Sequence, residues 1–308
     1  MSAPVPLAIT GATGFVGQAV LDEAAARGLP VRALTRRPQQ PMANVEWVQG
    51  GLDDAAGLRA CCDGVSAVLH IAGLTNTPDP AQFEQANVAG TQAVIDAAKG
   101  ARVKRFVFVS SLSAREPKLS AYGASKARAE ALVQASGLDW TTVRPPGVYG
   151  PRDVDYFEMF RSAKLGVVPL PPRGASSIIH VTDLARLLLD LVDAQPALVR
   201  KKLFEPDDGR TGGYGHDELA QMIGRAVGRR RVFAPHLPAR LLKAGARIDS
   251  LLRGAKARLT ADRASYMAHP NWVSRSDRAV PKPVWQPEIG GEEGMRRTAA
   301  WYREEGWL

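Results

Sequence analysis

The stretch Thr10-Gly11-Ala12-Thr13-Gly14-Phe15-Val16-Gly17 lies between a short apolar run, Leu7 to Thr10, and an Ala-rich run from Val16 to Arg27. Glycines in such a turn let the chain tighten, bring backbone N–H groups close to a phosphate and allow the helix to pack on the strand. The N-terminus of the helix adds partial positive charge. This stretch therefore predicts a strand, turn and helix that hold the pyrophosphate of a dinucleotide.

Working outward from this turn, short apolar runs alternate with longer amphipathic runs through the first half of the chain. Alternation of this kind is typical of a parallel sheet with helices on both faces. The predicted strands are Leu7 to Thr10, Val31 to Leu34, Val45 to Val48, Ala67 to Ile71, Phe106 to Ser110 and Trp140 to Arg144. The predicted helices are Val16 to Arg27, Ala55 to Cys62, Ala81 to Lys99 and Tyr122 to Ser136. The predicted fold is a doubly wound α/β (Rossmann) domain over residues 1–150.

The alternation stops at Pro145-Pro146-Gly147, and Pro and Gly recur as far as Gly174. A strand at Ile178 to Val181 and a helix ending at Val192 indicate that residues 176–200 return to the first domain. Three more helices are expected near Asp217 to Val227, Pro238 to Leu252 and Glu292 to Glu305. Residues 151–175 and 201–308 are therefore predicted to form a smaller C-terminal α/β lobe that binds the substrate.

Composition narrows the protein class. The chain has 308 residues, of which 45% are hydrophobic and 23% charged, as expected for a compact globular protein rather than a disordered or fibrous one. Its apolar runs are shorter than a membrane span, and its N-terminus does not resemble a secretory signal. The adjacent Cys61 and Cys62 lack the spacing of a metal site or a disulfide framework. We expect a cytoplasmic protein with no bound metal.

The net charge is +9, and the excess of basic residues lies in the C-terminal half. Between Arg225 and Arg263, eleven basic residues accompany only Asp249 and Asp262. Aromatic residues are sparse there and no nucleic-acid motif is present, so a solvated basic surface is favoured over nucleic-acid binding. An apolar stripe from Leu241 to Leu252 is interspersed with arginines; packing against the core is favoured over contact with a membrane surface.

The end of the second predicted strand carries Thr35-Arg36-Arg37-Pro38 and no carboxylate. At this position in dinucleotide-binding folds, an acid selects a free ribose 2′-hydroxyl and an arginine accepts a 2′-phosphate. Arg36 can offer its planar guanidinium to phosphate oxygens, and Arg37 adds positive charge. NADP is therefore predicted over NAD.

A second motif predicts catalysis. Ser110 and Ser111 end the fifth predicted strand, and Tyr122-Gly-Ala-Ser-Lys126 begins a helix eleven residues later. Tyrosine and lysine four residues apart share a helix face, and a nearby ammonium lowers the pKa of a phenol, which makes Tyr122 a usable proton donor. Ser111, or Ser113 in its place, could hydrogen-bond a substrate carbonyl.

Together these motifs resemble the short-chain dehydrogenase/reductase superfamily, and its extended, epimerase/dehydratase-like branch above all. Further matching segments extend the resemblance over nearly two-thirds of the chain. They are His70-Ile-Ala-Gly73, Asn87-Val-Ala-Gly-Thr91, Arg144-Pro145 through Val148-Tyr-Gly-Pro151, and His180-Val-Thr-Asp183.

The resemblance implies a role for each matching residue. Tyr122 would exchange the proton, Lys126 would bind the nicotinamide ribose, Ser111 would orient the substrate oxygen, and Asn87 would support the active-site helix and a water. The cofactor would be bound by Gly11, Gly14, Phe15, Val16, Gly17, Arg36, Arg37, Leu52, Asp53, Ala72, Gly73, Lys126 and Pro145. Gly51 stands where the family usually has Asp, and the Ser-to-Tyr interval is shorter than in nucleotide-sugar enzymes.

Three functions stay open at this point. The first is an NADP-dependent oxidoreductase acting on a carbonyl or secondary alcohol of a small molecule. The second is a nucleotide-sugar epimerase or dehydratase that holds NAD(P) tightly, and the third is a non-catalytic NADP-binding regulatory or assembly protein. The intact Tyr122 and Lys126 pair favours an enzyme, and a homodimer is kept as an option for its assembly.

Overall fold

A computed structural model describes residues 5–254, 257 and 259–308 of the chain. The chain forms two compact units, each built from separate segments of the sequence. The first unit comprises Met1–Arg144, Ala185–Phe204 and Val280–Trp285, and the second comprises Pro145–Leu184, Glu205–Ala279 and Gln286–Leu308.

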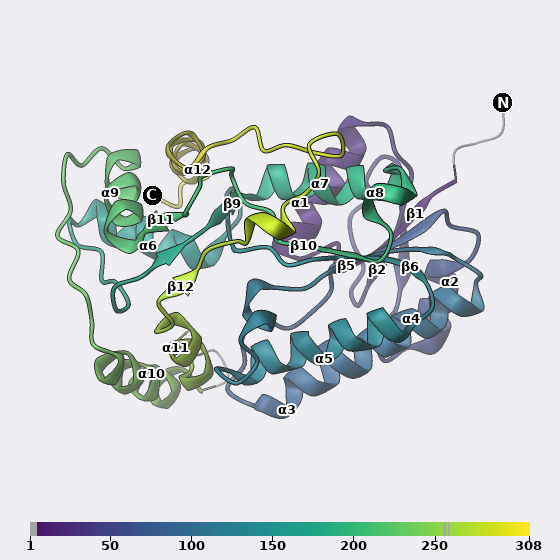
Figure 1. Cartoon of the computed structure of the whole chain (residues 1–308), viewed down its shortest axis with the longest axis horizontal. Helices are drawn as coiled ribbons and strands as arrows, with labels where there is room; N and C mark the ends of the chain where they lie inside the picture. The colour runs from purple at the N-terminus through teal and green to yellow at the C-terminus, as the bar shows by residue number, and fades with distance from the viewer. Residues whose placement is uncertain (1–4, 255–256, 258) are drawn as a thin grey trace. The chain divides into compact units, whose positions relative to one another are not determined.

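The first unit is built on a parallel sheet of seven strands (Figure 1). Buried apolar runs form its centre because both faces of a parallel sheet are covered by helices. The order is β10-β6-β5-β4-β1-β2-β3, which places the reversal of strand order next to β1. The strands are β1 (Leu7–Thr10), β2 (Val31–Thr35), β3 (Val45–Gln49), β4 (Ala67–His70), β5 (Arg105–Val109), β6 (Asp139–Val143) and β10 (Lys202–Phe204).

Helices cover both faces of this sheet, as the alternating sequence predicts (Figure 1). On one face, α1 (Phe15–Ala26) and α7 (Val181–Asp193) are joined by the ion pair between Arg27 and Asp190. On the other face, α2 (Ala55–Cys62), α4 (Gly90–Gly100) and α5 (Ala121–Ala135) pack in sequence. This second layer includes the buried Cys61 and Cys62, whose pKa values burial raises to about 12 and about 11, so neither is a ready nucleophile. The Rossmann fold expected from the sequence is confirmed.

The single helix expected from Ala81 to Lys99 is divided into three parts. A short α3 (Pro80–Phe83) is followed by a π-helical turn, Glu84–Ala89, before α4 begins. Asn87, inside the π turn, is 1% exposed, and its side chain forms hydrogen bonds with the backbone of Leu74. Turns of this type often occur at functional sites.

In the part of the chain that the structure describes, the second unit contains two small sheets and five α-helices that lie wholly within it. β7 (Gly147–Tyr149) pairs with β9 (Ile178–His180), and β8 (Ala175–Ser176) pairs with β11 (Tyr214–Gly215) and β12 (Asn271–Trp272). The helices are α6 (Val154–Lys164), α9 (His216–Ala226), α10 (Ala239–Arg253), α11 (Ala261–Met267) and α12 (Gly291–Glu304). Tyr149, Phe160, Met295 and Tyr302 are fully buried in its core. In the described ranges, no helix is long and apolar enough to cross a membrane.

The domain boundaries differ from the expected ones. Residues 185–200 of the expected segment lie in the first unit, which takes Ala185–Phe204 and Val280–Trp285, whereas residues 176–184 lie in the second unit. The reason is strand pairing: β9 pairs with β7 in the second unit, whereas β10 adds to the main sheet beside β6. β10 is only three residues long, too short for a periodic signal in the sequence.

Candidate nucleotide-binding and catalytic site

The glycine-rich turn between β1 and α1 leaves no room for side chains. Gly11 adopts φ +78°, and a Cβ atom there would lie 2.6 Å from the backbone N of Ala72. A Cβ atom on Gly17 would overlap the carbonyl oxygen of Gly11 and lie 2.7 Å from the Cα of Ala12. The turn is closed by a hydrogen bond of 3.0 Å from Gly14 N to Gly11 O. These contacts require glycine at positions 11 and 17.

The N-terminus of α1 has no side-chain cap. Gly14 is the N-cap residue, and the first turn contains no acidic residue. Phe15 and Val16 are half-buried, while Gly14 is exposed. The first N–H groups of a helix lack partners within the helix and favour an anion. The turn therefore fits the pyrophosphate of a nicotinamide dinucleotide.

Two exposed arginines, Arg36 and Arg37, follow the end of β2. Their backbone is held in place, because Gln49 Nε2 donates to Arg36 O at 2.9 Å and Thr35 Oγ1 donates to Arg37 O at 2.7 Å. The Arg36 side chain passes the loop at Gly51: a Cβ on Gly51 would lie 3.7 Å from Arg36 Cγ. The aliphatic part of the Arg36 side chain therefore lies beside the Gly51 loop, where the adenosine is expected to bind.

The loop after β3 contains Gly51, the residue that departs from the family pattern. A Cβ atom on Gly51 would lie 2.5 Å from Asp53 Oδ1, so the carboxylate of Asp53 occupies the space that a side chain at position 51 needs. Leu52 packs against Gly90 at the start of α4, with its Cδ1 2.7 Å from the position of a Cβ there. Leu52 thus contacts the start of α4, and the exposed Asp53 side chain lies over Gly51.

His70 joins the glycine turn to the helix that carries Asn87. Its ring is fully buried, with Nδ1 2.6 Å from Thr10 Oγ1 and Nε2 2.9 Å from Thr91 Oγ1. Thr91 uses its own proton to donate to Asn87 O at 2.6 Å, so it accepts from His70 Nε2–H. His70 is then a neutral ring whose Nδ1 accepts a hydrogen bond from the Thr10 hydroxyl, in agreement with a pKa lowered to about 3 by burial and by the charge of Lys126.

We expect acid to destabilise the protein through His70. Below pH 6.5 the unfolded chain binds a proton at this histidine, whereas the folded chain binds it only near pH 3, so stability falls as the pH decreases through this window. The free energy of unfolding should be about 2 kcal/mol lower at pH 5 than at pH 7 from this group. Urea unfolding of the wild type and of His70→Gln at both pH values measures it. An equal pH dependence in the two proteins would contradict the assignment.

Asn87 connects three segments of the site by hydrogen bonds. Its Nδ2 donates to Leu74 O and to Ser125 Oγ, both at 2.9 Å, and its Oδ1 accepts from Leu74 N at 2.7 Å. Ser125 in turn donates to the carbonyl oxygen of Tyr122 at 2.7 Å. The side chain therefore holds the loop after β4 and the start of α5 in fixed positions.

Tyr122 and Lys126 lie one turn apart on α5. Tyr122 is 8% exposed, and its ring packs against Phe83 with the ring centres 5.8 Å apart. Lys126 Nζ donates to Val109 O at 2.7 Å and lies 4.6 Å from the centre of the Phe108 ring. Burial lowers the pKa of Lys126 to about 8, while Glu130 raises it in part. Gly73 lies close to the Asn87 side chain: a Cβ there would be 3.1 Å from Asn87 Oδ1 and 3.6 Å, an ordinary contact distance, from Lys126 Nζ.

The three serines after β5 have different environments. Ser110 is buried and donates to Glu130 Oε1 at 2.5 Å. Ser111 caps a short 3₁₀ turn, accepting from Ser113 N at 3.2 Å, and its hydroxyl lies 3.3 Å from that of Ser113. Ser111 is only half-buried. Its hydroxyl and that of Ser113 are therefore both near the carboxyl end of β5, where ligands bind in such sheets.

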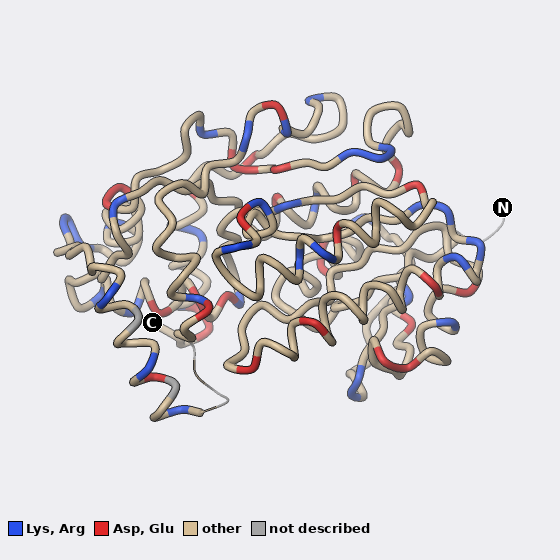
Figure 2. Tube along the Cα trace, turned by 60° about the horizontal axis from the view of Figure 1, so that its bottom comes forward, with Lys and Arg blue, Asp and Glu red and all other residues tan. Residues whose placement is uncertain are grey.

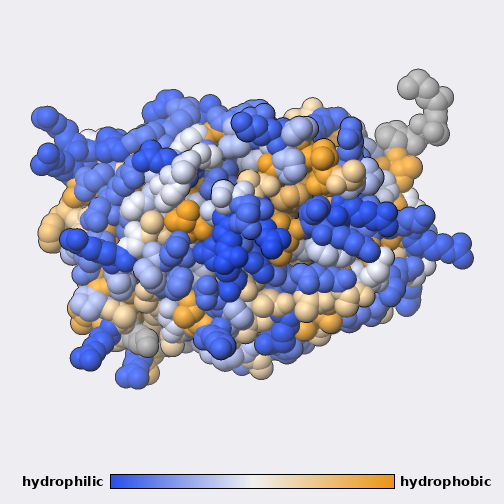
Figure 3. Space-filling model, viewed as in Figure 1, coloured by the Kyte–Doolittle hydropathy of each residue, from blue (hydrophilic) through white to orange (hydrophobic). Residues whose placement is uncertain are grey.

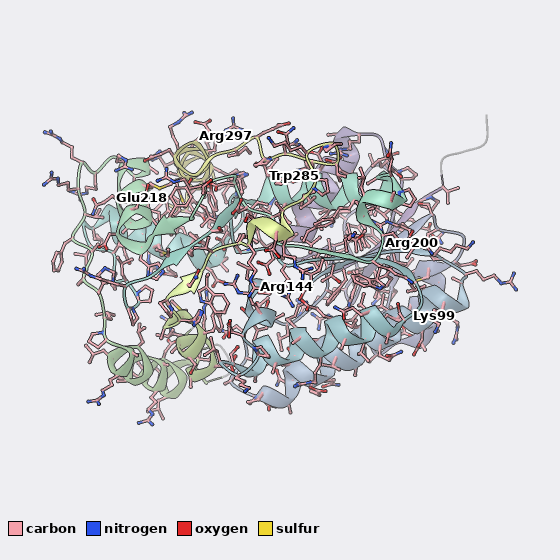
Figure 4. All side chains as sticks on the ribbon, in the orientation of Figure 1. Lys99, Arg144, Arg200, Glu218, Trp285 and Arg297 are labelled. Atoms are coloured by element: carbon pink, nitrogen blue, oxygen red, sulfur yellow. The ribbon has the colours of Figure 1, made fainter. Side chains whose placement is uncertain are left out.

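Glu130 was not predicted from the sequence. Its carboxylate, 4% exposed, pairs with Arg144 at 2.6 Å and also accepts from Ser110. Arg144 is labelled in Figure 4. The spacing Tyr122, Lys126, Glu130 places all three on one face of α5, and that signal was available. The ion pair anchors α5 to the end of β6.

The structure brings most of the predicted residues to the carboxyl edge of the first unit's sheet. Pro145 follows Arg144 directly after the end of β6 and is the first residue of the second unit. Among the described side chains, no group of three or more His, Cys, Asp or Glu is arranged to hold a metal ion.

The comparisons with known proteins agree with this geometry. Residues 11–195 match the family model described as NAD(P)H-binding. The chain is 34% identical to the ceramide reductase of Caulobacter vibrioides over 98% of this chain and 96% of that one. It is 28% identical to the 2-alkyl-3-oxoalkanoate reductase of Stenotrophomonas maltophilia over 95% and 98%. The solved UDP-N-acetylglucosamine 4-epimerase of Bacillus cereus shares the fold, with TM-score 0.71, 19% identity and coverage of 97% and 96%.

The matched region includes the glycine turn, the loop after β4 and the Tyr122 to Lys126 segment described above. The chain thus belongs to the NAD(P)H-binding family, and it is an NAD(P)-dependent oxidoreductase.

Proposed function

We propose that this protein is an NADPH-dependent reductase that converts a ketone on a lipid-like molecule into a secondary alcohol. The observation that carries the proposal is Lys126, a buried ammonium that donates to Val109 O one helical turn after Tyr122. A solvated surface lysine would not be held in this way. A buried ammonium one turn after a tyrosine on the same helix face is the arrangement that proton transfer by tyrosine needs at neutral pH.

Each residue of the proposed site has a separate role in this reaction. The bound nicotinamide supplies the hydride to the carbonyl carbon. Tyr122 donates its phenolic proton to the carbonyl oxygen, and the positive charge of Lys126 stabilises the phenolate that remains. Ser111 donates a hydrogen bond to the same oxygen and orients it, with Ser113 adjacent. Asn87 positions the start of α5, because its side chain donates a hydrogen bond to Ser125 Oγ and Ser125 in turn donates to Tyr122 O.

The preference for NADP rests on Arg36 and Arg37, the exposed arginines at the end of β2. Changing Arg36 to Ala should weaken NADPH binding by roughly 10- to 100-fold, because a charge-assisted bond to the 2′-phosphate is lost. NADH binding should change little. Fluorescence titration of both cofactors measures the effect, and Arg59→Ala, an exposed arginine on α2, is the control. Equal loss for NADH and NADPH would contradict recognition of the phosphate.

The proposed substrate class rests on the two relatives that match along the full chain. One is named a ceramide reductase and the other a 2-alkyl-3-oxoalkanoate reductase. Both names describe alkyl-bearing substrates, and the second specifies a 3-oxo group. The short interval between Ser111 and Tyr122 removes the loop with which nucleotide-sugar enzymes of the branch usually surround the sugar. A 3-oxo lipid is therefore the substrate class that we propose.

The experiment that tests the function follows the oxidation of NADPH. Purified protein is mixed with NADPH and a 2-alkyl-3-oxoalkanoate or a 3-oxo long-chain amide, and the absorbance of the reduced nicotinamide is recorded. We expect stoichiometric consumption of NADPH and formation of the alcohol. An epimerase would convert a UDP-sugar without net consumption of NADPH. That result, with no oxidation in the presence of 3-oxo lipids, would overturn the proposal.

A further inference from the structure

Helix α10 has two apolar faces, of which only one is packed. Leu242 and Ala246 point inward and form a small cluster with Ala264 of α11. On the opposite side, four large side chains are exposed: Leu241 by 57%, Ile248 by 58%, Leu251 by 85% and Leu252 by 80%. We call these four residues the outer face of α10. Contiguous apolar side chains of this size on a surface mark an interaction site. Only some residues of the apolar stripe predicted from Leu241 to Leu252 therefore pack into the core.

Cations border the outer face. Arg240 and Arg247 are exposed beside it on the same helix, while Arg253, also exposed, lies on the side of Ala246 and Asp249. The helix has one acidic residue, Asp249, whose carboxylate is mostly buried: it pairs with Arg253 at 3.2 Å and accepts from Leu259 N at 2.9 Å. Figure 2 shows basic residues recurring along α10, and in Figure 3 apolar and strongly hydrophilic residues adjoin in the region that α10 occupies in Figure 1.

We infer that the outer face of α10 docks on the surface of an anionic lipid bilayer. Leucine and isoleucine side chains enter the boundary between headgroups and acyl chains, while the arginines contact phosphate groups. The helix lies in the plane of the membrane; with 15 residues it is too short to span it.

The positive charge beside the outer face of α10 favours an anionic bilayer over a second copy of this chain as its partner. Two outer faces packed together would bring the arginines of both copies into proximity, and like charges oppose such a contact. An anionic bilayer offers both an apolar interior and negative headgroups, which match both parts of the surface. The docking does not depend on the substrate proposed above, because it is measured without substrate.

Flotation of the full-length protein with lipid vesicles tests the inference. We expect the wild type to float with vesicles of phosphatidylglycerol and phosphatidylethanolamine and not with phosphatidylcholine alone, and high salt to weaken the binding. The double variant Ile248→Gln/Leu252→Gln should lose at least about 10-fold in binding. Arg240→Gln/Arg247→Gln should lose roughly fivefold for each arginine. All of these positions are exposed, so NADPH binding and the thermal midpoint should stay unchanged.

Two matched controls locate the contact. Leu165→Gln removes a leucine of the same 80% exposure at the end of α6, and Arg59→Gln/Lys99→Gln makes the same change in net charge on α2 and α4 (Figure 4). Both should bind vesicles as the wild type does. If the controls lost as much vesicle binding as the α10 variants, or if the wild type did not float, the inference would be overturned. Sedimentation showing a dimer that Ile248→Gln/Leu252→Gln dissociates would instead assign the face to a second copy and overturn it as well.

Discussion

Replacing Tyr122 by Phe is expected to lower kcat for ketone reduction by roughly 10²- to 10⁴-fold, the contribution of general acid catalysis. The change removes only the hydroxyl, so the ring keeps its contact with Phe83 and the fold is retained. NADPH binding should be nearly unchanged, because the phenol acts on the substrate oxygen. Steady-state kinetics and a cofactor titration on the same preparation separate the two effects.

The matched control is Tyr156→Phe, which removes a buried hydroxyl from α6 in the second unit. We expect little change in kcat there. If Tyr122→Phe retained full activity, the phenol would not be the proton donor, and the proposed mechanism would be wrong. If it lost NADPH binding to the same extent as kcat, the hydroxyl would be a structural group.

The second large effect is expected from Gly17→Ala. The added Cβ would overlap the carbonyl oxygen of Gly11 and approach the Cα of Ala12 to 2.7 Å, and both are backbone atoms that cannot move independently. Helix α1 must shift from β1, which costs about 1–3 kcal/mol of stability by overpacking. The shift also displaces the first N–H groups of α1, so NADPH binding should fall below detection. Urea unfolding and fluorescence titration measure the two losses.

Gly100→Ala is the control for this variant. Gly100 ends α4, and nothing lies within 4 Å of a Cβ built there. Alanine also favours helix more than glycine, so stability should stay the same or increase slightly. A Gly17→Ala protein as stable as the wild type and with unchanged NADPH affinity would show that the turn tolerates a side chain, contrary to the geometry above.

Local patterns predicted the first unit well because its signals are short-range. The strand boundaries of β1 to β6 agree with the expected runs to within two residues, since each buried strand is a dense apolar run between polar turns. The division of the Ala81 to Lys99 helix was not predicted. The π turn there depends on bonds from Asn87 to Leu74 and Ser125, residues that are 13 and 38 positions away. No periodicity in a single segment carries that information.

The second unit shows the same limit more strongly. Its strands are two or three residues long, and β7 pairs with β9 across about thirty residues of intervening chain, so pairing is decided by the partners and not by local propensity. The stripe on α10 was expected to cover the core. The structure buries Leu242 and leaves Leu251 and Leu252 exposed, because α11 covers only one side of the helix.

The amino-acid sequence alone determined the glycine turn, the order of strands and helices in the first unit, and the spacing of Tyr122 and Lys126. Each of these depends on neighbouring residues, through backbone sterics or helix geometry. Only the tertiary structure decided that His70 is a neutral link between Thr10 and Thr91, that Glu130 holds Arg144 and Ser110, and that part of α10 faces solvent. These features arise where segments distant in sequence meet, and burial there sets both the charge state and the partner of each side chain.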